Sequence, residues 1–397
     1  MKALHSHAWA MLLTVCACAR SVDTDVADVD DPGLVDPVWA IGMPNTYAQL
    51  VCPALIDGDI VIGSDGGVAR LDAHDGTTMW WVPFEEEAHY GVTGAVAALA
   101  AAGDGLYAVT RFDAETLVVN ADGESWGRWL APEATGMDEP NVEGIAVAGG
   151  HLWVEFSNWS DMSVAMAFDA ATLYTAPSVD VRTAITDGPR RGGLFAQRDG
   201  LLVVGGYPAG SSFIDPHSGA VKWEVAAGVS YGPGECAASG LCISGDNIVD
   251  FTTGEVVWSF QEPFRLVSAA VTDIGFLFMV TGPDTGQTWT SATDVDGVEL
   301  FRTWVGRWRW DPSYGVTAPD GQVSYFAHED GYFAVNARDG SVIAEYHVSP
   351  ETSAFGVFAG VCRPLLTRAG VVQKTSFGVM TLPYPPGVGP SGFLDER

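Results

Sequence analysis

Positive charge is scarce in this 397-residue chain. It has 19 Lys and Arg residues against 50 Asp and Glu, a formal net charge of -31 at neutral pH. The only lysines are Lys2, Lys222 and Lys374. Binding to a nucleic-acid backbone depends on Lys and Arg that neutralise phosphates, and adsorption to anionic lipid depends on basic clusters. We therefore predict no nucleic-acid partner and no basic membrane-binding surface.

The common catalytic motifs are also missing. The sequence has no G-x-S-x-G, H-E-x-x-H or Walker loop, and no C-x-x-C pair after residue 18. A G-x-G-x-x-G pattern occurs at residues 387–392, but it lies in a Pro-rich tail with no helical pattern after it. A dinucleotide site needs a helix at that point. We expect a protein that is not an enzyme.

The N-terminal stretch, MKALHSHAWAMLLTVCACARS, predicts an export signal. Its apolar run is too short to span a membrane. Two cleavage sites stay open: residues 15–18 resemble a bacterial lipobox, which implies a lipid on Cys18, whereas residues 17–19 fit ordinary cleavage before Arg20. We favour the lipid anchor, because the acidic run that follows is typical of a solvated tether. The predicted segments are a signal at 1–18, an acidic disordered tether at 19–36, a folded domain at 37–385 and a Gly/Pro-rich tail at 386–397.

A repeated phrase, Asp-x-x-x-Gly-x-x-x-Trp, organises the folded domain. Clear copies begin at Leu71 (LDAHDGTTMW), Ile214 (IDPHSGAVKW) and Val249 (VDFTTGEVVW). With weaker copies included, the anchor residues are 35 to 49 positions apart: Asp72, Asn120, Asp169, Asp215, Asp250, Asp294 and Asn336. Short alternating strand patterns separated by Gly, Asp and Pro fill each interval. An all-strand repeat of this length predicts the blades of a β-propeller.

Two acidic clusters in these phrases suggest ion sites when they are taken alone. His74 lies between Asp72 and Asp75, and the stretch from Asp294 to Gly297 resembles part of a calcium loop. Both clusters coincide with a repeat anchor. His217 takes the position of His74 in the copy at Ile214, and the copies at Val249 and Asn336 have other residues there. Asp and Gly are also the residues of an ordinary hairpin turn. We interpret both clusters as turns and expect no metal site there.

The phrases resemble the signature of PQQ-like, or quinoprotein-type, β-propeller repeats. The resemblance covers roughly residues 38–384 and implies that the tryptophans dock on the neighbouring blade. They are Trp80, Trp223 and Trp258, and Trp39 begins a similar phrase of its own. Quinoprotein dehydrogenases of similar architecture hold PQQ and Ca²⁺, and typically carry two adjacent cysteines. This sequence has no such pair, and we expect neither PQQ nor Ca²⁺.

The number of strand patterns predicts an eight-bladed propeller. Seven anchors give seven blades, and residues 360–382 contain three further strand patterns. The fourth strand of this last blade is expected from residues 37–42, PVWAIG, which precede the first blade. Pairing the two chain ends would cover the exposed strand edges of an open array. The predicted fold is all-β, with the ring closed by the N-terminal strand.

The remaining cysteines are Cys52, Cys236, Cys242 and Cys362. Cys52 and Cys362 occupy the same position in the innermost strands of the first and last blades, which predicts a disulfide across the seam. Cys236 and Cys242 flank a Ser-Gly turn and predict a second disulfide. Four buried free thiols are the alternative, since Cys is a common core residue.

One segment departs from the repeat. Arginine and aromatic residues crowd between residues 302 and 314, and both types are enriched where proteins bind each other. In the alternative reading, Trp304 docks its blade while Trp308 and Trp310 cover an inner strand. The candidate patch consists of Arg302, Trp304, Arg307, Trp308, Arg309, Trp310 and Tyr314.

In architecture and length the chain is similar to BamB-type lipoproteins, which belong to the machinery that assembles outer-membrane proteins. The resemblance implies an exported outer-membrane lipoprotein, facing the periplasm or the cell surface, that serves as a monomeric, non-catalytic scaffold for envelope proteins. A surface propeller that binds carbohydrate or another polymer is the main alternative. A PQQ-dependent dehydrogenase is the third.

Overall fold

The computed structural model describes the chain in separated ranges. They are residues 34–42, 52–64, 66–84, 96–102, 105–110, 115–130, 141–158, 162–169, 179–187, 194–196, 202–206, 210–225, 240–244, 247–250, 252–259, 265–282, 287–307, 315–328, 331–348, 362–375 and 378–388. All of these ranges lie in one compact unit, Gly33–Arg397. The predicted signal, Cys18 and residues 19–32 of the predicted tether lie outside them.

Every regular element in these ranges is a strand, and the strands form eight sheets. Six sheets have four strands each. They are β3 (Ala54–Ile56), β4 (Asp59–Ser64), β5 (Gly67–Leu71) and β6 (Thr78–Pro83); β7 (Val96–Ala102), β8 (Gly105–Thr110), β9 (Glu115–Asn120) and β10 (Ser125–Leu130); β11 (Asn141–Ala148), β12 (His151–Asn158), β13 (Met162–Asp169) and β14 (Val179–Asp187); β15 (Leu194–Ala196), β16 (Leu202–Gly206), β17 (Gly210–Ile214) and β18 (Val221–Val225); β22 (Arg265–Val271), β23 (Phe276–Thr281), β24 (Gln287–Thr293) and β25 (Glu299–Arg307); and β30 (Leu365–Leu366), β31 (Val371–Thr375), β32 (Gly378–Leu382) and β2 (Trp39–Gly42).

The other two sheets differ in strand number. One has three described strands: β19 (Leu241–Ser244), β20 (Asn247–Asp250) and β21 (Val256–Ser259). The other has five: β26 (Gly315–Thr317), β27 (Val323–His328), β28 (Gly331–Asn336), β29 (Val342–Val348) and β1 (Leu34–Val35). Neighbouring strands are antiparallel in every sheet, with the exception of the parallel pair β1 and β29.

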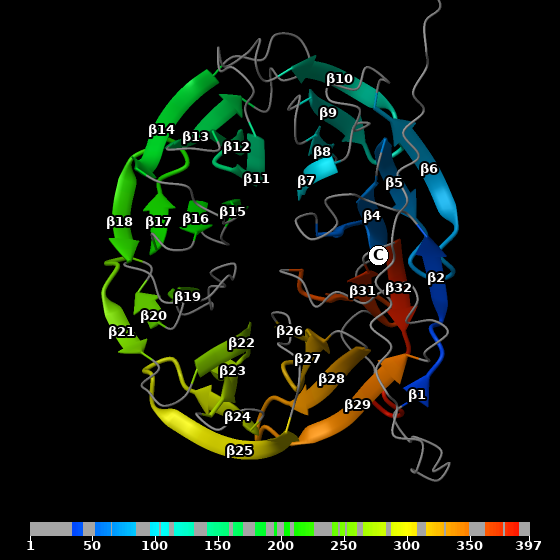
Figure 1. Cartoon of the computed structure of the whole chain (residues 1–397), viewed down its shortest axis with the longest axis vertical. Coiled ribbons are helices and arrows are strands. Elements are labelled where there is room, and N and C mark those ends of the chain that lie inside the picture. The colour runs from blue at the N-terminus through cyan, green and yellow to red at the C-terminus, as the bar shows by residue number, and fades with distance from the viewer. Residues whose placement is uncertain are drawn as a thin grey trace, which may run out of the picture. The chain divides into compact units, whose positions relative to one another are not determined.

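Figure 1 shows the sheets following one another around a common axis, with β7, β11, β15, β19, β22 and β26 toward the centre and β10, β14, β18, β21, β25 and β29 toward the periphery. This arrangement confirms the predicted all-β propeller. The predicted eight blades are not shown: six sheets have the four strands of a complete blade in the described part of the chain. Six of the seven predicted anchors lie at or just after the end of the third strand of their sheet, and Asp250 ends β20, the second of three described strands.

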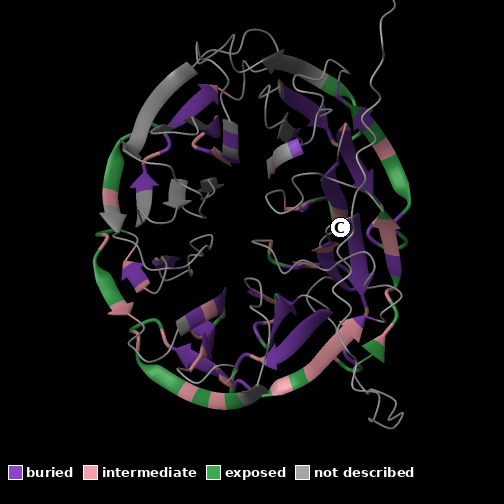
Figure 2. Ribbon diagram, in the orientation of Figure 1, coloured by how far each residue is buried: buried purple, intermediate pink, exposed green. Residues whose placement is uncertain are grey.

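The two ends of the propeller domain meet in one sheet, as the sequence predicts. β2 is the outermost strand beside β32, and Trp39 and Gly42 are paired with Thr381 and Gly378. Figure 2 shows that the described residues of the inner strands are mostly buried, whereas those of the peripheral strands are mostly intermediate or exposed. Within the phrase PVWAIG, residues 39–42 thus form a peripheral strand, and Trp39 of this strand is buried.

The predicted disordered tether, residues 19–36, includes two residues near its C-terminal end that form a strand. Leu34 and Val35 form β1, which pairs with His347 and Val348 of β29. A parallel strand here satisfies backbone groups of β29 that would otherwise face solvent at the sheet edge. Val35 also packs against a hydrophobic cluster of the propeller.

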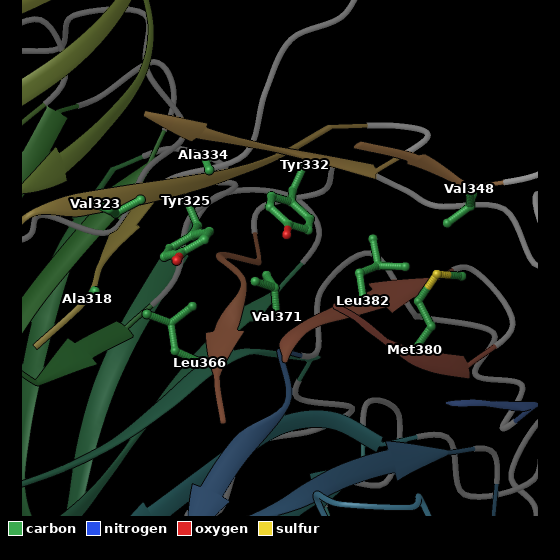
Figure 3. Close-up of a cluster of buried hydrophobic side chains, with 10 residues drawn as sticks. All are labelled: Ala318, Val323, Tyr325, Tyr332, Ala334, Val348, Leu366, Val371, Met380 and Leu382. Atoms are coloured by element: carbon green, nitrogen blue, oxygen red, sulfur yellow. The ribbon is translucent and has the colours of Figure 1, made fainter. Parts of the chain in front are cut away.

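Packing between consecutive sheets is clearest between β26–β29 and β30–β32 (Figure 3). Tyr325 and Tyr332 have no solvent exposure and point from the first sheet toward Leu366, Val371 and Leu382 of the second. The Tyr332 hydroxyl donates a hydrogen bond to the Pro383 carbonyl. The Tyr325 hydroxyl donates to the Val388 carbonyl at 3.3 Å, so the predicted C-terminal tail begins with an ordered, packed turn.

Candidate functional site

The repeat turns use their aspartates to hold the backbone. Oδ1 of the anchor carboxylate accepts a hydrogen bond from the N–H two residues later: from His74 at 2.7 Å for Asp72, from His217 at 3.0 Å for Asp215 and from Asp296 at 2.9 Å for Asp294. This is the Asx turn that such residues favour. Hydrogen bonds from Ser218 and Lys222 lower the pKa of Asp215 to about 2. These contacts support the prediction that both acidic clusters are turns.

Each predicted docking tryptophan lies over a glycine in the turn of the next sheet. A Cβ at Gly76 would lie 2.8 Å from Trp39 Cδ2, and one at Gly123 would lie 2.6 Å from Trp80 Cγ. The indole N–H groups donate to carbonyls of the same turns: Trp39 to Ala73 at 3.1 Å and Trp80 to Ala121 at 2.9 Å. Trp223 contacts Gly254 and Trp258 contacts Gly297 in the same way.

The sheet of β22–β25 departs from this rule. Phe301, not Trp304, lies over the turn glycine of the next sheet, where a Cβ at Gly340 would come within 3.1 Å of Phe301 Cδ2. Trp304 is 63% exposed. The reading in which Trp304 docks its blade is therefore wrong. The physical reason is position: the docking residue lies four positions after the turn glycine, as Trp80 follows Gly76, and Phe301, not Trp304, lies four positions after Gly297.

The candidate patch is described in part. Arg302 and Trp304 are exposed, and Arg302 forms an ion pair with Glu299. Leu300 is exposed too, so residues 300, 302 and 304 share the outward face of β25, because side chains alternate along a strand. The side chain of Arg307, and residues Trp308, Arg309, Trp310 and Tyr314, lie outside the described residues.

The seam disulfide is present. Cys52 and Cys362 are bonded across a sequence separation of 310 residues, with their Cα atoms 5.1 Å apart. Cys242 is also disulfide-bonded and fully buried. Cys236, its predicted partner, lies outside the described residues.

A group of metal-ligating side chains occurs in the sheet of β26–β29. One nitrogen each from His328 and His347 and one oxygen from Glu345 all lie within 4.8 Å of one another. His347 Nε2 is 3.0 Å from Glu345 Oε1, and the two imidazole rings have centroids 5.1 Å apart. Burial and the neighbouring His347 lower the pKa of His328 to about 3. His328 is therefore neutral near pH 7, the form in which imidazole binds a metal.

Strand register brings these residues together. His328 and His347 are both paired with Gly331, from opposite sides of β28. Glu345 lies two residues before His347, so the two side chains share a face. This group of residues was not predicted from the sequence. The pattern Glu-x-His is visible in the sequence, but the contribution of His328 depends on the pairing of three strands.

In the described part of the chain, no helix has the length and apolarity needed to cross a membrane. No protein-family model and no curated protein sequence matches the chain.

Several solved structures match at low sequence identity. BamB from Moraxella catarrhalis is 13% identical, with a TM-score of 0.61 over 88% of this chain and 99% of that chain. The C-terminal WD40 domain of Sif2 is 12% identical, with a TM-score of 0.63 over 89% of this chain and 99% of that domain. The computationally designed protein Ika8 is 12% identical, with a TM-score of 0.61 over 87% of this chain and 98% of that chain. These likenesses establish a shared propeller fold.

Proposed function

We propose that the chain is a non-catalytic, protein-binding scaffold on an eight-bladed propeller of PQQ-like repeats. Eight sheets support the blade number. The five-stranded sheet is a blade to which β1 has been added, and the sheet of β19–β21 has the second, third and fourth strands of a blade. The stretch that would supply its first strand lies outside the described residues. The repeat type is supported by the turns of Asp72, Asp215 and Asp250. Each of these turns is followed by a docking tryptophan, as in the PQQ-like repeat phrase.

The outward face of β25 carries the proposed binding role. Leu300 is 46% exposed and Trp304 63% exposed on a peripheral strand, where polar residues are expected. The preceding peripheral strand, β21, adds exposed Val256 and Val257. An exposed tryptophan beside an arginine is the composition of a binding hot spot. A partner that covers this strip would remove apolar surface from water, and the hydrophobic stabilisation would be about 25 cal/mol for each Å² removed.

The partner is an extended segment of another protein, added as a strand along the β25 edge. β25 is paired with β24 and is the last described strand of its sheet, so its outer backbone groups form a sheet edge. Strand addition at such an edge is a common mode of peptide recognition. The chain does this to itself: β1 adds to the equivalent peripheral strand of the next sheet, β29.

The location we propose is the bacterial envelope, with a lipid on Cys18. The apolar N-terminal run and the lipobox-like residues 15–18 support export and anchoring, and the shared fold with BamB from Moraxella catarrhalis supports an envelope role. By this proposal the partner is an envelope protein, with participation in outer-membrane assembly as its narrowest form. The chain works as a monomer without a cofactor.

Site-specific crosslinking tests the scaffold. A photo-crosslinking residue at position 304, introduced into the full chain in intact cells, is expected to capture one recurring envelope protein. Trp304→Ala should weaken recovery of that protein in a pull-down by at least about tenfold, the effect of a hot-spot residue. Trp81→Ala is the matched control, because Trp81 is an exposed tryptophan on another peripheral strand, β6.

Other results would contradict the proposal. Retention on cell-wall polysaccharide with no crosslinked protein would support the polymer-binding alternative. A stoichiometric quinone in native mass spectrometry, together with dehydrogenase activity, would support an enzyme. If Trp304→Ala and Trp81→Ala recovered equal amounts of the partner, the binding surface would not be on β25.

A further inference from the structure

We propose that His328, Glu345 and His347 form a binding site for one divalent transition metal of the zinc class, with three protein ligands and one coordination position left for water. The three residues come from two strands, β27 and β29, on the same face of their sheet. This site is separate from the strip on β25 and does not depend on the proposed scaffold function.

The spacing of the donor atoms suits such an ion. Ligands at about 2.0–2.2 Å from a tetrahedral Zn²⁺ lie about 3.3–3.6 Å from one another. His347 Nε2 and Glu345 Oε1 are 3.0 Å apart, close to this spacing. The third donor, from His328, lies within 4.8 Å of the others. Small side-chain rotations of His347 and Glu345, which are partly exposed, close the remaining distance.

The chemistry of the donors selects the metal. Two imidazoles with one carboxylate are the ligands of zinc sites that keep an open position, whereas Ca²⁺ and Mg²⁺ prefer oxygen ligands alone. Imidazole suits Zn²⁺ and its first-row neighbours. The net charge of -31 adds a long-range attraction for any cation, but it gives no preference for zinc.

The surroundings hold the buried imidazole in place. His328 is 1% exposed and is hydrogen-bonded to the backbone of Tyr346. A ring fixed through a backbone hydrogen bond is a regular feature of histidines that ligate metals. Phe333 packs against the same ring, at 4.4 Å between centroids. Gly331 lies between the two histidines in β28, and with no side chain there the imidazoles can approach each other over the middle strand.

A metal at this position would link two strands that are not direct neighbours. β27 and β29 are separated by β28, and His347 is also the residue that pairs with Leu34 of β1. A bound ion would therefore stabilise the peripheral strand to which β1 attaches. The partial exposure of Glu345 and His347 provides a route of entry from solvent.

The test is a titration of the purified full chain, without a polyhistidine tag, with Zn²⁺ in the presence of a large excess of Mg²⁺. Isothermal calorimetry is expected to show one ion per chain. Co²⁺ in place of Zn²⁺ is expected to give the visible absorption of a low-coordinate nitrogen and oxygen site. His347→Gln and Glu345→Gln should each weaken zinc binding by about 100-fold or more, because loss of an outer-shell partner alone costs about 10–100-fold.

His217→Gln is the matched control, because His217 is an exposed histidine next to a carboxylate, Asp215, in a repeat turn. Circular dichroism and gel filtration of each variant exclude misfolding as the cause of lost binding. His347 and Glu345 are chosen for substitution because they are partly exposed, unlike His328. Zinc binding that Mg²⁺ abolishes, that survives both substitutions, or that falls equally in His217→Gln would overturn the proposal, as would the absence of binding.

Discussion

At the scale of single residues, the contact between an aromatic ring and a turn glycine joins neighbouring sheets. Trp39, Trp80, Trp223, Trp258 and Phe301 each lie over a glycine with positive φ in the following turn. Glycine is required at each of these positions for two reasons. Its positive φ is unfavourable for other residues, and a Cβ there would overlap the aromatic ring. The indole hydrogen bonds to Ala73 and Ala121 fix the ring over this gap.

Substitution of Gly123 tests the two requirements separately. Gly123→Ala is expected to lower the free energy of unfolding by about 2–5 kcal/mol, because a positive φ costs Ala about 1–2 kcal/mol and overlap with Trp80 adds about 1–3 kcal/mol. Gly150 has φ +79 but nothing within 4 Å of an added Cβ, so Gly150→Ala should cost about 1–2 kcal/mol. Urea unfolding of both variants measures the difference. Equal costs would show that the Trp80 contact contributes nothing.

The tryptophan positions were predictable because the signal is local. Aspartate, glycine and tryptophan recur at fixed spacing within one turn and one strand, so the sequence alone places them. Phe301 was not predicted, because the repeat phrase is recognised by its tryptophan and this copy has phenylalanine at the docking position. Counting four positions from the glycine, as from Gly76 to Trp80, leads from Gly297 to Phe301.

At the scale of strands, pairing between distant segments was predictable only where a strand pattern had no partner. Residues 37–42 form a complete strand phrase outside the first blade, and the last blade lacks one strand, so the pairing of β2 with β32 follows. β1 has two residues and no alternation, and its parallel pairing with β29 leaves no trace in the sequence. The cluster of His328, Glu345 and His347 was missed for the same reason, since it depends on register across β28.

The seam between the first and last sheets is held by the Cys52–Cys362 disulfide. A covalent link across 310 residues restricts the unfolded chain strongly. Cys52→Ser with Cys362→Ser is expected to lower the free energy of unfolding by up to about 5 kcal/mol. Thermal unfolding at matched concentration checks this.

The control for the seam disulfide is Cys236→Ser with Cys242→Ser, whose predicted loop is so short that the chain-entropy term is only about 2 kcal/mol. A seam variant that is no less stable than this control would show that the β2–β32 pairing alone keeps the ring closed.

At the scale of the whole molecule, the fold is a ring whose continuity depends on both chain ends. Trp39 packs in a cluster with Ile60 and Ile62 of β4 and with Val372 and Val379 of β31 and β32. The fourth strand of the last sheet thus also contributes to the core shared with the first sheet. The whole chain has a formal net charge of -31, which favours solubility over self-association.

Truncation on either side of β2 tests the closure. A chain that begins at residue 37 keeps β2 and loses, among the described strands, only β1, and we expect it to remain a folded monomer with a slightly lower melting temperature. A chain that begins at residue 43 loses Trp39, whose removal from a core costs about 3–5 kcal/mol, and exposes the edge of β32. Such an edge pairs readily with other chains. Light scattering and thermal unfolding should therefore show a less stable, associating protein, and a stable monomer from residue 43 would refute the closure by β2.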